Sequence, residues 1–426
     1  MTEATDGLDG EQPMAKRVAD RRADPTHRRA GLSQAAPLLA GSCMPVLGSV
    51  LITPVLPRLS EHFGGVPGAD VLVPLIVALP ALMIAVFAPF AGQIVDRLGR
   101  RSLLLGAMLV YALAGTAPVW LDSLAAILAS RVVVGICEAA IMTACTTLLV
   151  DYFPGERRRN RYLGLQTVVT TLAATAFIAI GGALGASGWK TPFWVYSVSI
   201  GIAAVMAVLL WEPTDADAGP QAIERTAAGG RFRLRTRIPW ERIGGPLWVT
   251  VFGGFTFYVL VLEVGYLVVA TGVAAENTQV IGWVAAVSSL ATALGGLSFS
   301  RISRLPRGVV LPAAFLLQSV GMIAIWVVPT GPGLIAGAAI TSFGSGVLLP
   351  SLITWVVAAA QFTDRGRITG WWTAAFFLGQ SLTPVLIAGL TLAAGSLTAA
   401  VGLAGIAAAV ASAVVGSVLS DRYRRS

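Results

Sequence analysis

The sequence predicts an all-α integral membrane protein, with twelve transmembrane helices arranged as two pseudo-symmetric six-helix bundles. Three observations lead to this fold class. Of 426 residues, 55% are hydrophobic and only 12% are charged, whereas soluble domains carry about 25% charged residues. Apolar runs of about 20 residues, the length that crosses a bilayer, recur along the whole chain. Finally, two polar motifs occur twice at nearly the same offset.

The apolar runs give the predicted spans and the domain organisation. The spans are residues 35–57, 71–94, 102–121, 124–149, 162–186, 191–211, 246–271, 278–299, 308–328, 332–358, 369–394 and 396–419. The predicted domains are a disordered N-terminal tail (1–34), a first bundle (35–211), a central loop (212–243), a second bundle (244–420) and a C-terminus (421–426).

The basic residues predict a multi-pass protein of the cell membrane with both termini in the cytoplasm. If the N-terminus is inside, 27 of the 30 lysines and arginines lie on one side of the membrane. The others are Arg58 and Lys190 near the opposite face and Arg131 within a span. Such a bias marks cytoplasmic loops. It also supports the number of spans, because a missed helix would scatter the charges.

Several functions are excluded by the same pattern. The net charge of +8 lies in short clusters between apolar runs, so we expect no nucleic-acid partner. Cys43, Cys137 and Cys145 lie inside apolar runs without disulfide or metal spacing. His27 and His62 lie outside the runs and no two acids are closely paired there, so neither a metal site nor a membrane enzyme is expected.

The segment 92–101 is a highly charged turn between two spans. Its chemistry comes from two glycines, one acid and three arginines: Gly92, Asp96, Arg97, Gly99, Arg100 and Arg101. The glycines are expected to permit close helix contact and a tight turn. The single acid should be held by an adjacent arginine or by a helix N-terminus, where anions are favoured.

Two motifs relate the halves of the chain. Gly-x-x-x-Asp-Arg-x-x-Arg at 92–100 returns at 296–304 as Gly-x-x-x-Ser-Arg-x-x-Arg. Similarly, Arg-x-Arg-x-x-Gly at 159–164 returns at 365–370. Parallel six-helix repeats of this kind fit a transporter that works by alternating access.

The segment 92–101 resembles the signature loop of the major facilitator superfamily, G-x-x-x-D-R-x-G-R-R/K, at all six of its defined positions. Twelve helices, a central cytoplasmic loop and a degraded second loop are also what that family shows. The resemblance covers residues from about 35 to 420. It implies that Asp96 contacts the N-terminus of the eleventh helix, near 367–370. This contact would latch the two bundles on the cytoplasmic side and favour the outward-open state. Alternatively, the arginines only fix the topology.

The second copy of the loop has Ser300 in place of the acid and keeps Arg301 and Arg304. The latch is therefore expected to be asymmetric, with Asp96 as its working acid. In the fourth span, the stretch from Arg131 to Gly135 resembles the family's R-x-x-x-G element, which the family links to proton coupling.

Three ionisable residues lie well inside spans: Arg131, Glu138 and Glu263. Charges at this depth are costly, so each is a candidate for proton coupling or substrate binding. Arg131 and Glu138 share a helix face but lie about 10 Å apart along the axis, too far to pair directly. Alternatively, Glu138 could be a buried structural partner of Arg131 or of a tyrosine, and Glu263 could also be a buried structural group. Gln166, Gln318 and Gln380 are expected to form interhelical hydrogen bonds or to line a cavity.

These features predict a monomeric secondary active transporter in the lipid bilayer, which moves a small organic solute without a cofactor and is driven by a proton gradient. The chain looks most like the twelve-helix drug:proton antiporter branch, in its length and its short outer loops. However, helix 1 has no buried acid, and Gly181 to Gly185 in the fifth span lacks the glycine–proline element of antiporters. Efflux is the predicted direction, with proton-coupled uptake or facilitated transport as the alternative.

Overall fold

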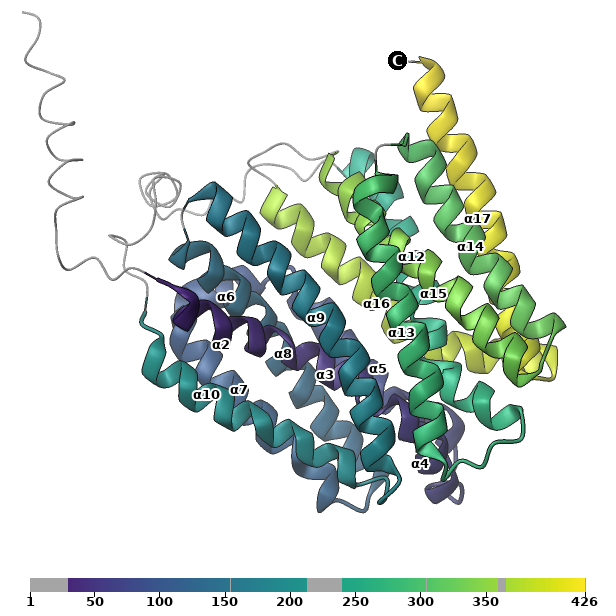
Figure 1. Ribbon diagram of the computed structural model, residues 1–426, viewed down its shortest axis with the longest axis horizontal. Helices are drawn as coiled ribbons and strands as arrows, with labels where there is room; N and C mark the ends of the chain where they lie inside the picture. The colour runs from purple at the N-terminus through teal and green to yellow at the C-terminus, as the bar shows by residue number, and fades with distance from the viewer. Residues whose placement is uncertain (1–29, 154, 213–239, 304, 359–364, 426) are drawn as a thin grey trace, which may run out of the picture.

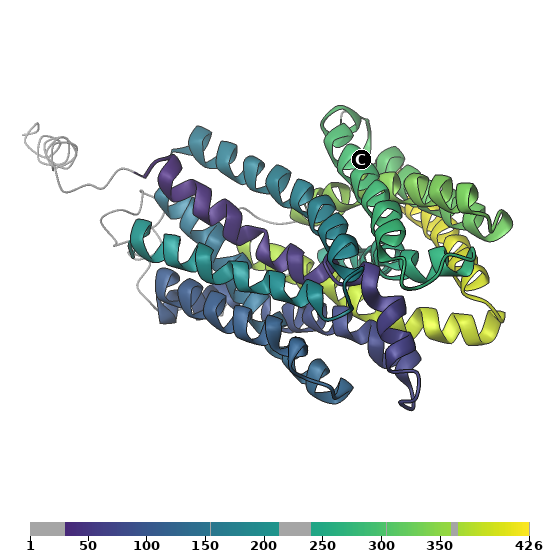
Figure 2. The ribbon, with the colours of Figure 1, turned by 60° about the horizontal axis from the view of Figure 1, so that its bottom comes forward.

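The computed structural model describes residues 30–153, 155–212, 240–303, 305–358 and 365–425. Every regular element in these ranges is a helix, and twelve spans are long and apolar enough to cross a membrane. The predicted fold class is therefore confirmed. The two halves of the chain form separate helical bundles that lie against each other (Figure 1; Figure 2). The predicted tail lies almost entirely outside the described residues, as does most of the central loop.

The first half contains six spans, some of them interrupted. Its elements are α2 (Leu32–Ser42), α3 (Met44–Val50), η1 (Thr53–Val55), α4 (Leu56–His62), α5 (Ala69–Phe87), α6 (Ala91–Leu98), α7 (Arg100–Thr116), η2 (Ala117–Val119), α8 (Leu124–Tyr152), α9 (Glu156–Gly185), η3 (Thr191–Ser197) and α10 (Val198–Leu209). The first four together form one span, which we call helix 1.

The second half is more regular. Each of its spans is a single helix: α12 (Trp240–Ala270), α13 (Thr278–Ile302), α14 (Arg307–Val327), α15 (Gly331–Ala358), α16 (Arg365–Ala394) and α17 (Leu397–Arg425). Most of these helices begin or end a few residues outside the predicted spans. The difference arises because polar residues continue a membrane helix for a turn or two beyond its apolar part.

Helix 1 is broken by its prolines. The backbone turns at Cys43 and again at Leu51 and Ile52, between α3 and η1. Pro45 and Pro54 each lie just after one of these turns. Because proline has no N–H, it removes a helical hydrogen bond and leaves a carbonyl four residues earlier without its usual donor. In a membrane, such carbonyls must find partners on neighbouring helices.

Glycines bring helix backbones into direct contact within the bundles. On α12, a Cβ added at Gly254 would collide with the backbone carbonyl of Phe376 on α16. On α16, a Cβ at Gly379 would collide with the carbonyl of Val251. Small residues at helix crossings allow this close packing, which drives association where lipid competes equally for apolar side chains.

The two halves meet along two helix pairs, α5 with α16 and α9 with α13. In the second pair, Gly182 and Gly282 face each other, and a Cβ on Gly182 would lie 2.8 Å from the Cα of Gly282. Thr278 also donates a hydrogen bond to the carbonyl of Gly182 at 2.7 Å. Figure 1 shows α9 and α13 converging toward the face opposite the C-terminus. The contacts between these two helices therefore close the molecule on that face.

We expect Gly254→Ala to destabilise the protein by about 1–3 kcal/mol, because the added methyl group overpacks a backbone contact. Gly245→Ala on the same helix is the matched control, since a Cβ there would meet no atom of the described chain within 4 Å. Thermal unfolding of both purified variants in detergent checks this. An unchanged melting temperature for Gly254→Ala would contradict the packing described above.

Candidate functional site

The charged turn between the second and third spans contains a short helix of its own. α5 ends at Phe87, α6 covers Ala91–Leu98 and α7 begins at Arg100. The predicted span 71–94 is therefore too long, because the apolar run continues through the turn at 88–90. Gly99 has φ 81° and ψ 135°, a conformation that only glycine adopts readily. The close helix contact expected at Gly92 is not found, since a Cβ there would meet no atom of the described chain within 4 Å.

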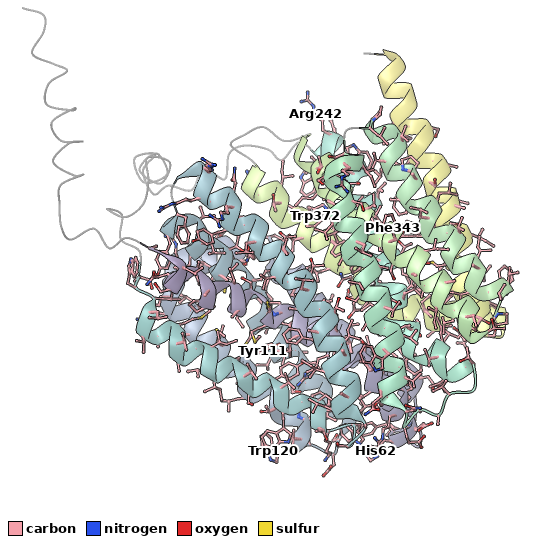
Figure 3. All side chains as sticks on the ribbon, viewed as in Figure 1. His62, Tyr111, Trp120, Arg242, Phe343 and Trp372 are labelled. Atoms are coloured by element: carbon pink, nitrogen blue, oxygen red, sulfur yellow. The ribbon has the colours of Figure 1, made fainter. Side chains whose placement is uncertain are left out.

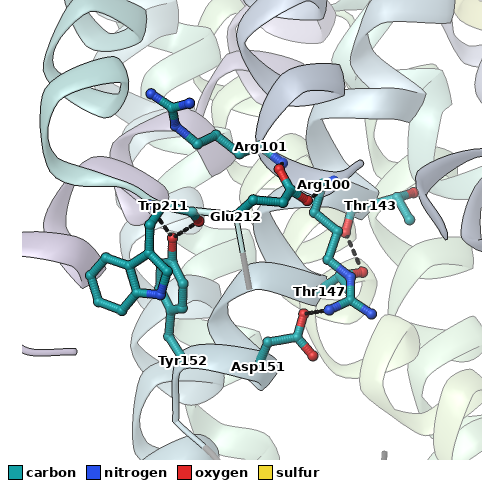
Figure 4. A network of polar contacts seen from close by, with 8 residues as sticks. All are labelled: Arg100, Arg101, Thr143, Thr147, Asp151, Tyr152, Trp211 and Glu212. Carbon is teal, nitrogen blue, oxygen red and sulfur yellow. Dashed lines mark hydrogen bonds and ion pairs between the residues drawn. The ribbon is translucent and has the colours of Figure 1, made fainter. Parts of the chain in front are cut away.

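A carboxylate from the end of the sixth span caps α7 (Figure 4). The Oε1 of Glu212 accepts a hydrogen bond from the backbone N–H of Arg100 at 2.5 Å, and its Oε2 accepts one from Arg101 at 2.9 Å. These N–H groups have no partner within the helix, and the helix dipole favours an anion there. Glu212 falls within the predicted central loop, 212–243, and is not among the predicted site residues. An acid directly after a span, on the same face as a basic turn, is the signal that could have identified it.

The side chains of two arginines of the turn also bind other helices of the first half. Arg100 forms an ion pair with Asp151 on α8, with 2.7 Å between Nη1 and Oδ2. Arg101 donates a hydrogen bond to the carbonyl of Ala207 on α10 at 2.7 Å. The hydroxyl of Tyr152 donates to the carbonyl of Trp211 at 2.6 Å and joins the same group of contacts (Figure 4). These arginines thus make specific contacts beyond fixing topology.

The first turns of α16 lie against the end of α5, close to this turn. A Cβ added at Gly370 would be 3.3 Å from the carbonyl oxygen of Ala88, just after the end of α5. The side chain of Asp96 lies outside the described part of the structure, so its contact with α16 stays a prediction. Arg97 and Arg301 are exposed, and Arg304 lies outside the described residues.

The second copy of the loop has a different backbone. α13 continues without interruption to Ile302, through the residues that correspond to α6. The hydroxyl of Ser300 donates to the carbonyl of Leu297 within its own helix, at 3.2 Å. The second copy thus differs from the first both in lacking the acid and in lacking the short helix.

Arg131 is fully buried inside the first bundle, where it binds backbone and rings. Its Nη2 donates to the carbonyls of Ala114 and Gly115 on α7, at 2.7 and 3.1 Å. Its guanidinium lies 5.4 Å from the ring centroid of Phe193 and 5.2 Å from that of Tyr196, within the range of cation–π attraction. Carbonyl dipoles and aromatic faces therefore balance this charge.

Glu138 is also fully buried, but it has no partner within the described residues. Neither carboxylate oxygen accepts or donates a hydrogen bond, and no ion pair joins Glu138 to Arg131, as their spacing predicts. The carboxylate occupies the space beside Gly48 of helix 1, where any Cβ would collide with it. The alternative that Glu138 is a structural partner of Arg131 thus has no contact to support it.

Glu263 lies on α12 and is 5% exposed. No hydrogen bond or ion pair to it is found among the described residues. Two glutamines form interhelical hydrogen bonds. Gln166 donates to the hydroxyls of Ser42 and Thr146, and Gln318 donates to Ser345 and accepts from Thr256. These bonds agree with the interhelical hydrogen bonds predicted for Gln166 and Gln318, whereas no such bond to Gln380 is found within the described part of the chain.

Both basic residues near the opposite face have partners. Arg58 donates to the carbonyl of Gly185 at 2.8 Å. Lys190 forms an ion pair with Asp122, with 2.7 Å between Nζ and Oδ1. The hydrogen bond and charge of Lys190 lower the pKa of the Asp122 carboxyl. Both side chains of this pair are in contact with solvent, so it adds little stability.

Twelve spans in two bundles, with a glycine–arginine turn between the second and third spans, agree with the comparison with known proteins. The sequence model of the Major Facilitator Superfamily matches residues 38–274 and 264–426. The chain belongs to this superfamily. It is therefore a membrane transporter and not an enzyme.

The similar proteins of known role include exporters. The bacillibactin exporter of Bacillus subtilis is 24% identical over 83% of this chain and 89% of its own length. The class E tetracycline resistance protein of Escherichia coli is 32% identical over 39% of this chain and 41% of its own. The quinolone resistance protein NorA of Staphylococcus aureus is 24% identical over 48% of this chain and 50% of its own length. The chain thus spans about two-fifths to half of the length of the resistance proteins that it matches.

Solved transporters share the fold. The xylose transporter XylE from E. coli, in an inward-open conformation, has a TM-score of 0.71 at 12% identity and covers 90% of this chain and 95% of its own. A bacterial homologue of the human lysosomal transporter Spinster, inward-facing and unoccupied, has a TM-score of 0.66 at 17% identity. The match covers 92% of this chain and 97% of that protein. At this identity the likeness concerns the fold alone.

We expect Gly99→Ala to destabilise the charged turn by about 1–3 kcal/mol, because its backbone conformation strains any residue with a Cβ. A Cβ at this position would also lie 3.4 Å from the carboxylate of Glu212. Gly92→Ala is the matched control in the same motif, where the helix has open space. Melting temperatures of the two variants test this, and equal values would contradict the assignment of the turn to Gly99.

Proposed function

We propose that this protein exports a small organic molecule in exchange for protons, and that Glu138 is the acid that carries the proton. The observation that carries the proposal is the buried carboxylate of Glu138, neither of whose oxygens has a partner in the described chain. A permanently charged group in this position would be very costly. A group that binds and releases a proton in each transport cycle explains why an acid is kept there.

The location of Glu138 supports this role. It lies on α8 at the level where helix 1 is interrupted, and Gly48 leaves room for its carboxylate. Movement of helix 1 relative to α8 would open this space to water. Alternating access requires such rearrangements between helices of a bundle and between the two bundles. Glu263, the second buried acid, is proposed as an auxiliary site for a proton or substrate. We also propose that Arg131 helps to position the site through α7 and the rings of the sixth span.

The direction of transport is proposed from the relatives. The bacillibactin exporter matches over most of this chain, and the tetracycline and quinolone resistance proteins match over part of it. We further propose that the protein lies in the cell membrane as a monomer with both termini in the cytoplasm. The proton gradient is its driving force, and it uses no cofactor and no nucleic-acid partner. The excess of arginine on the face that carries the termini supports this orientation.

The charged turn is proposed as the gate on the cytoplasmic side. Contacts of Arg100, Arg101 and Glu212 hold it to the first half. The first turns of α16, from the second half, lie against the end of α5, a few residues before this turn. Asp96 between these elements would connect the two halves whenever the cytoplasmic side is closed, through the helix dipole of α16. Arg97 on the exposed face of α6 and Arg301 and Arg304 in the second copy are proposed to support this latch.

We expect Glu138→Gln to abolish transport driven by a pH gradient, because the amide cannot exchange the proton. Proteoliposomes with tetracycline, a quinolone or bacillibactin as the probe measure this, with Glu61→Gln as the control at an exposed acid on α4. Movement of the probe against the proton flow indicates antiport, and movement with it indicates the alternative symport. Full gradient-driven transport by Glu138→Gln would show that another group carries the proton.

We expect Asp96→Asn to slow turnover while substrate binding is retained, since the loss of the charge weakens the closed cytoplasmic gate by roughly 0.3–1 kcal/mol. Ser300→Ala at the corresponding position of the second copy is the control and should leave turnover unchanged. Initial transport rates and equilibrium binding of the same probe distinguish the two effects. Wild-type turnover of Asp96→Asn would remove the latch from the mechanism.

A further inference from the structure

Three tyrosine hydroxyls supply donors to the interrupted part of helix 1. Tyr111 on α7 donates to the carbonyl of Met44 at 2.6 Å, and Tyr196 on η3 donates to that of Gly48 at 3.5 Å. Tyr258 on α12 lies within donor distance of two carbonyls, that of Ser49 at 3.3 Å and that of Val77 on α5 at 3.4 Å. We call these residues the tyrosine triad. Figure 3 shows Tyr111 within the first bundle.

One member of the tyrosine triad comes from the other half of the protein. Tyr111 and Tyr196 belong to the first half, so their bonds stay within one bundle. Tyr258 belongs to the second half, and it is only 2% exposed among the core residues of the first. Its hydroxyl therefore connects the two halves at the level of the break in helix 1.

The tyrosine triad surrounds the space that Glu138 occupies. The carboxylate lies against Gly48, and the triad binds the carbonyls of Met44, Gly48 and Ser49 on either side. Helix 1 offers only backbone here. The charged and titratable groups near Glu138 are Arg131 and Cys137 on its own helix, with Tyr111, Tyr196 and Tyr258 from the three helices around it.

We propose that the hydroxyl of Tyr258 is a switch between the two halves, which turns from the carbonyls of Ser49 and Val77 to the carboxylate of Glu138 when that carboxylate loses its proton. The inference rests on the proposed function, in which Glu138 carries the proton. A buried carboxylate that ionises needs hydrogen-bond donors, and the hydroxyls of the tyrosine triad are donors around it. Tyr258 acts here as a positioning residue.

The bonds of Tyr196 and Tyr258 are both long, and of these two donors only Tyr258 belongs to the second half. The bond from Tyr111 to Met44 is short, at 2.6 Å, and therefore strong. The hydroxyl of Tyr258 shares one proton between two acceptors at 3.3 and 3.4 Å, beyond the usual range for hydroxyl donors. Exchanging this weak shared bond for one to a charged carboxylate is favourable. The exchange replaces the bonds of α12 to helix 1 and α5 by one to α8, so loss of the proton changes which helices of the first half α12 contacts.

The test measures how pH moves the halves apart. Spin labels at Asn160→Cys on α9 and Ser300→Cys on α13 report the separation of these helices near the face that carries the termini, and the native cysteines, Cys43, Cys137 and Cys145, are all buried. Distances are measured on the purified full chain from about pH 5 to pH 9. We expect two populations, with α9 and α13 close together or far apart at this face. The ratio of these populations should change with pH in the otherwise unaltered protein. Tyr258→Phe should reduce this change roughly 10-fold or more, the effect of losing a hydrogen bond to a charged group.

Tyr266→Phe is the matched control, because Tyr266 lies on the same helix and also bonds across the halves, to Ser60 at 2.8 Å. It should shift the ratio equally at all pH values and keep the pH response. Tyr258→Gln returns a donor that does not titrate and should restore part of the response. A Gln variant as unresponsive as Tyr258→Phe would contradict the switch.

Infrared difference spectra separate the two hypotheses. The protonated-carboxyl band that Glu138→Gln removes should still titrate in Tyr258→Phe, which shows that the acid works while its link to the second half is lost. If Glu138→Gln keeps the pH response, the proposed function fails. If Glu138→Gln loses the response while Tyr258→Phe keeps it as Tyr266→Phe does, Glu138 keeps its role and the switch is wrong.

Discussion

The structure depends on one constraint: a polar group inside a bilayer must find its partner within the protein. Gln166 and Gln318 meet this requirement through hydrogen bonds between helices. Arg131 binds backbone carbonyls and lies against aromatic rings. Backbone carbonyls of the interrupted helix 1 accept hydrogen bonds from tyrosines on three neighbouring helices. Glu138 is one exception, a buried acid neither of whose oxygens has a partner in the described residues, and the Nη1 of Arg131 also lacks a hydrogen bond there. An acid that is an exception to so strict a rule is best explained as a group whose charge changes during function.

The same environment explains how the helices pack. Lipid chains compete with apolar side chains, so close backbone contact stabilises helix pairs more effectively than bulky residues do. Gly254 and Gly379 bring α12 to α16, and Gly182 and Gly282 bring the two halves together. Contacts between the halves thus include direct contact of backbone with backbone, as between Gly182 and Gly282.

Much of this could be predicted from the sequence, because hydropathy and charge bias report directly on the membrane. The number of spans, the repeat and the identity of the buried charges needed no structure. The boundary at Phe87 could not be predicted, since the apolar run passes through the turn. Nor could the cap at Glu212 or the place of Tyr258 among first-half residues, because both depend on which helices become neighbours in space. At Gly92 the sequence pattern predicted a close helix contact that the structure does not show, because a glycine of a motif need not lie at such a contact.

The cap on α7 has a consequence for how the protein is made. Glu212 lies 112 residues after Arg100, whose backbone N–H it binds. During synthesis, the third span therefore enters the membrane with its N-terminal N–H groups exposed to water. They acquire their carboxylate only after the sixth span has been translated. The bond that fixes the charged turn can thus form only once the whole first half has been translated.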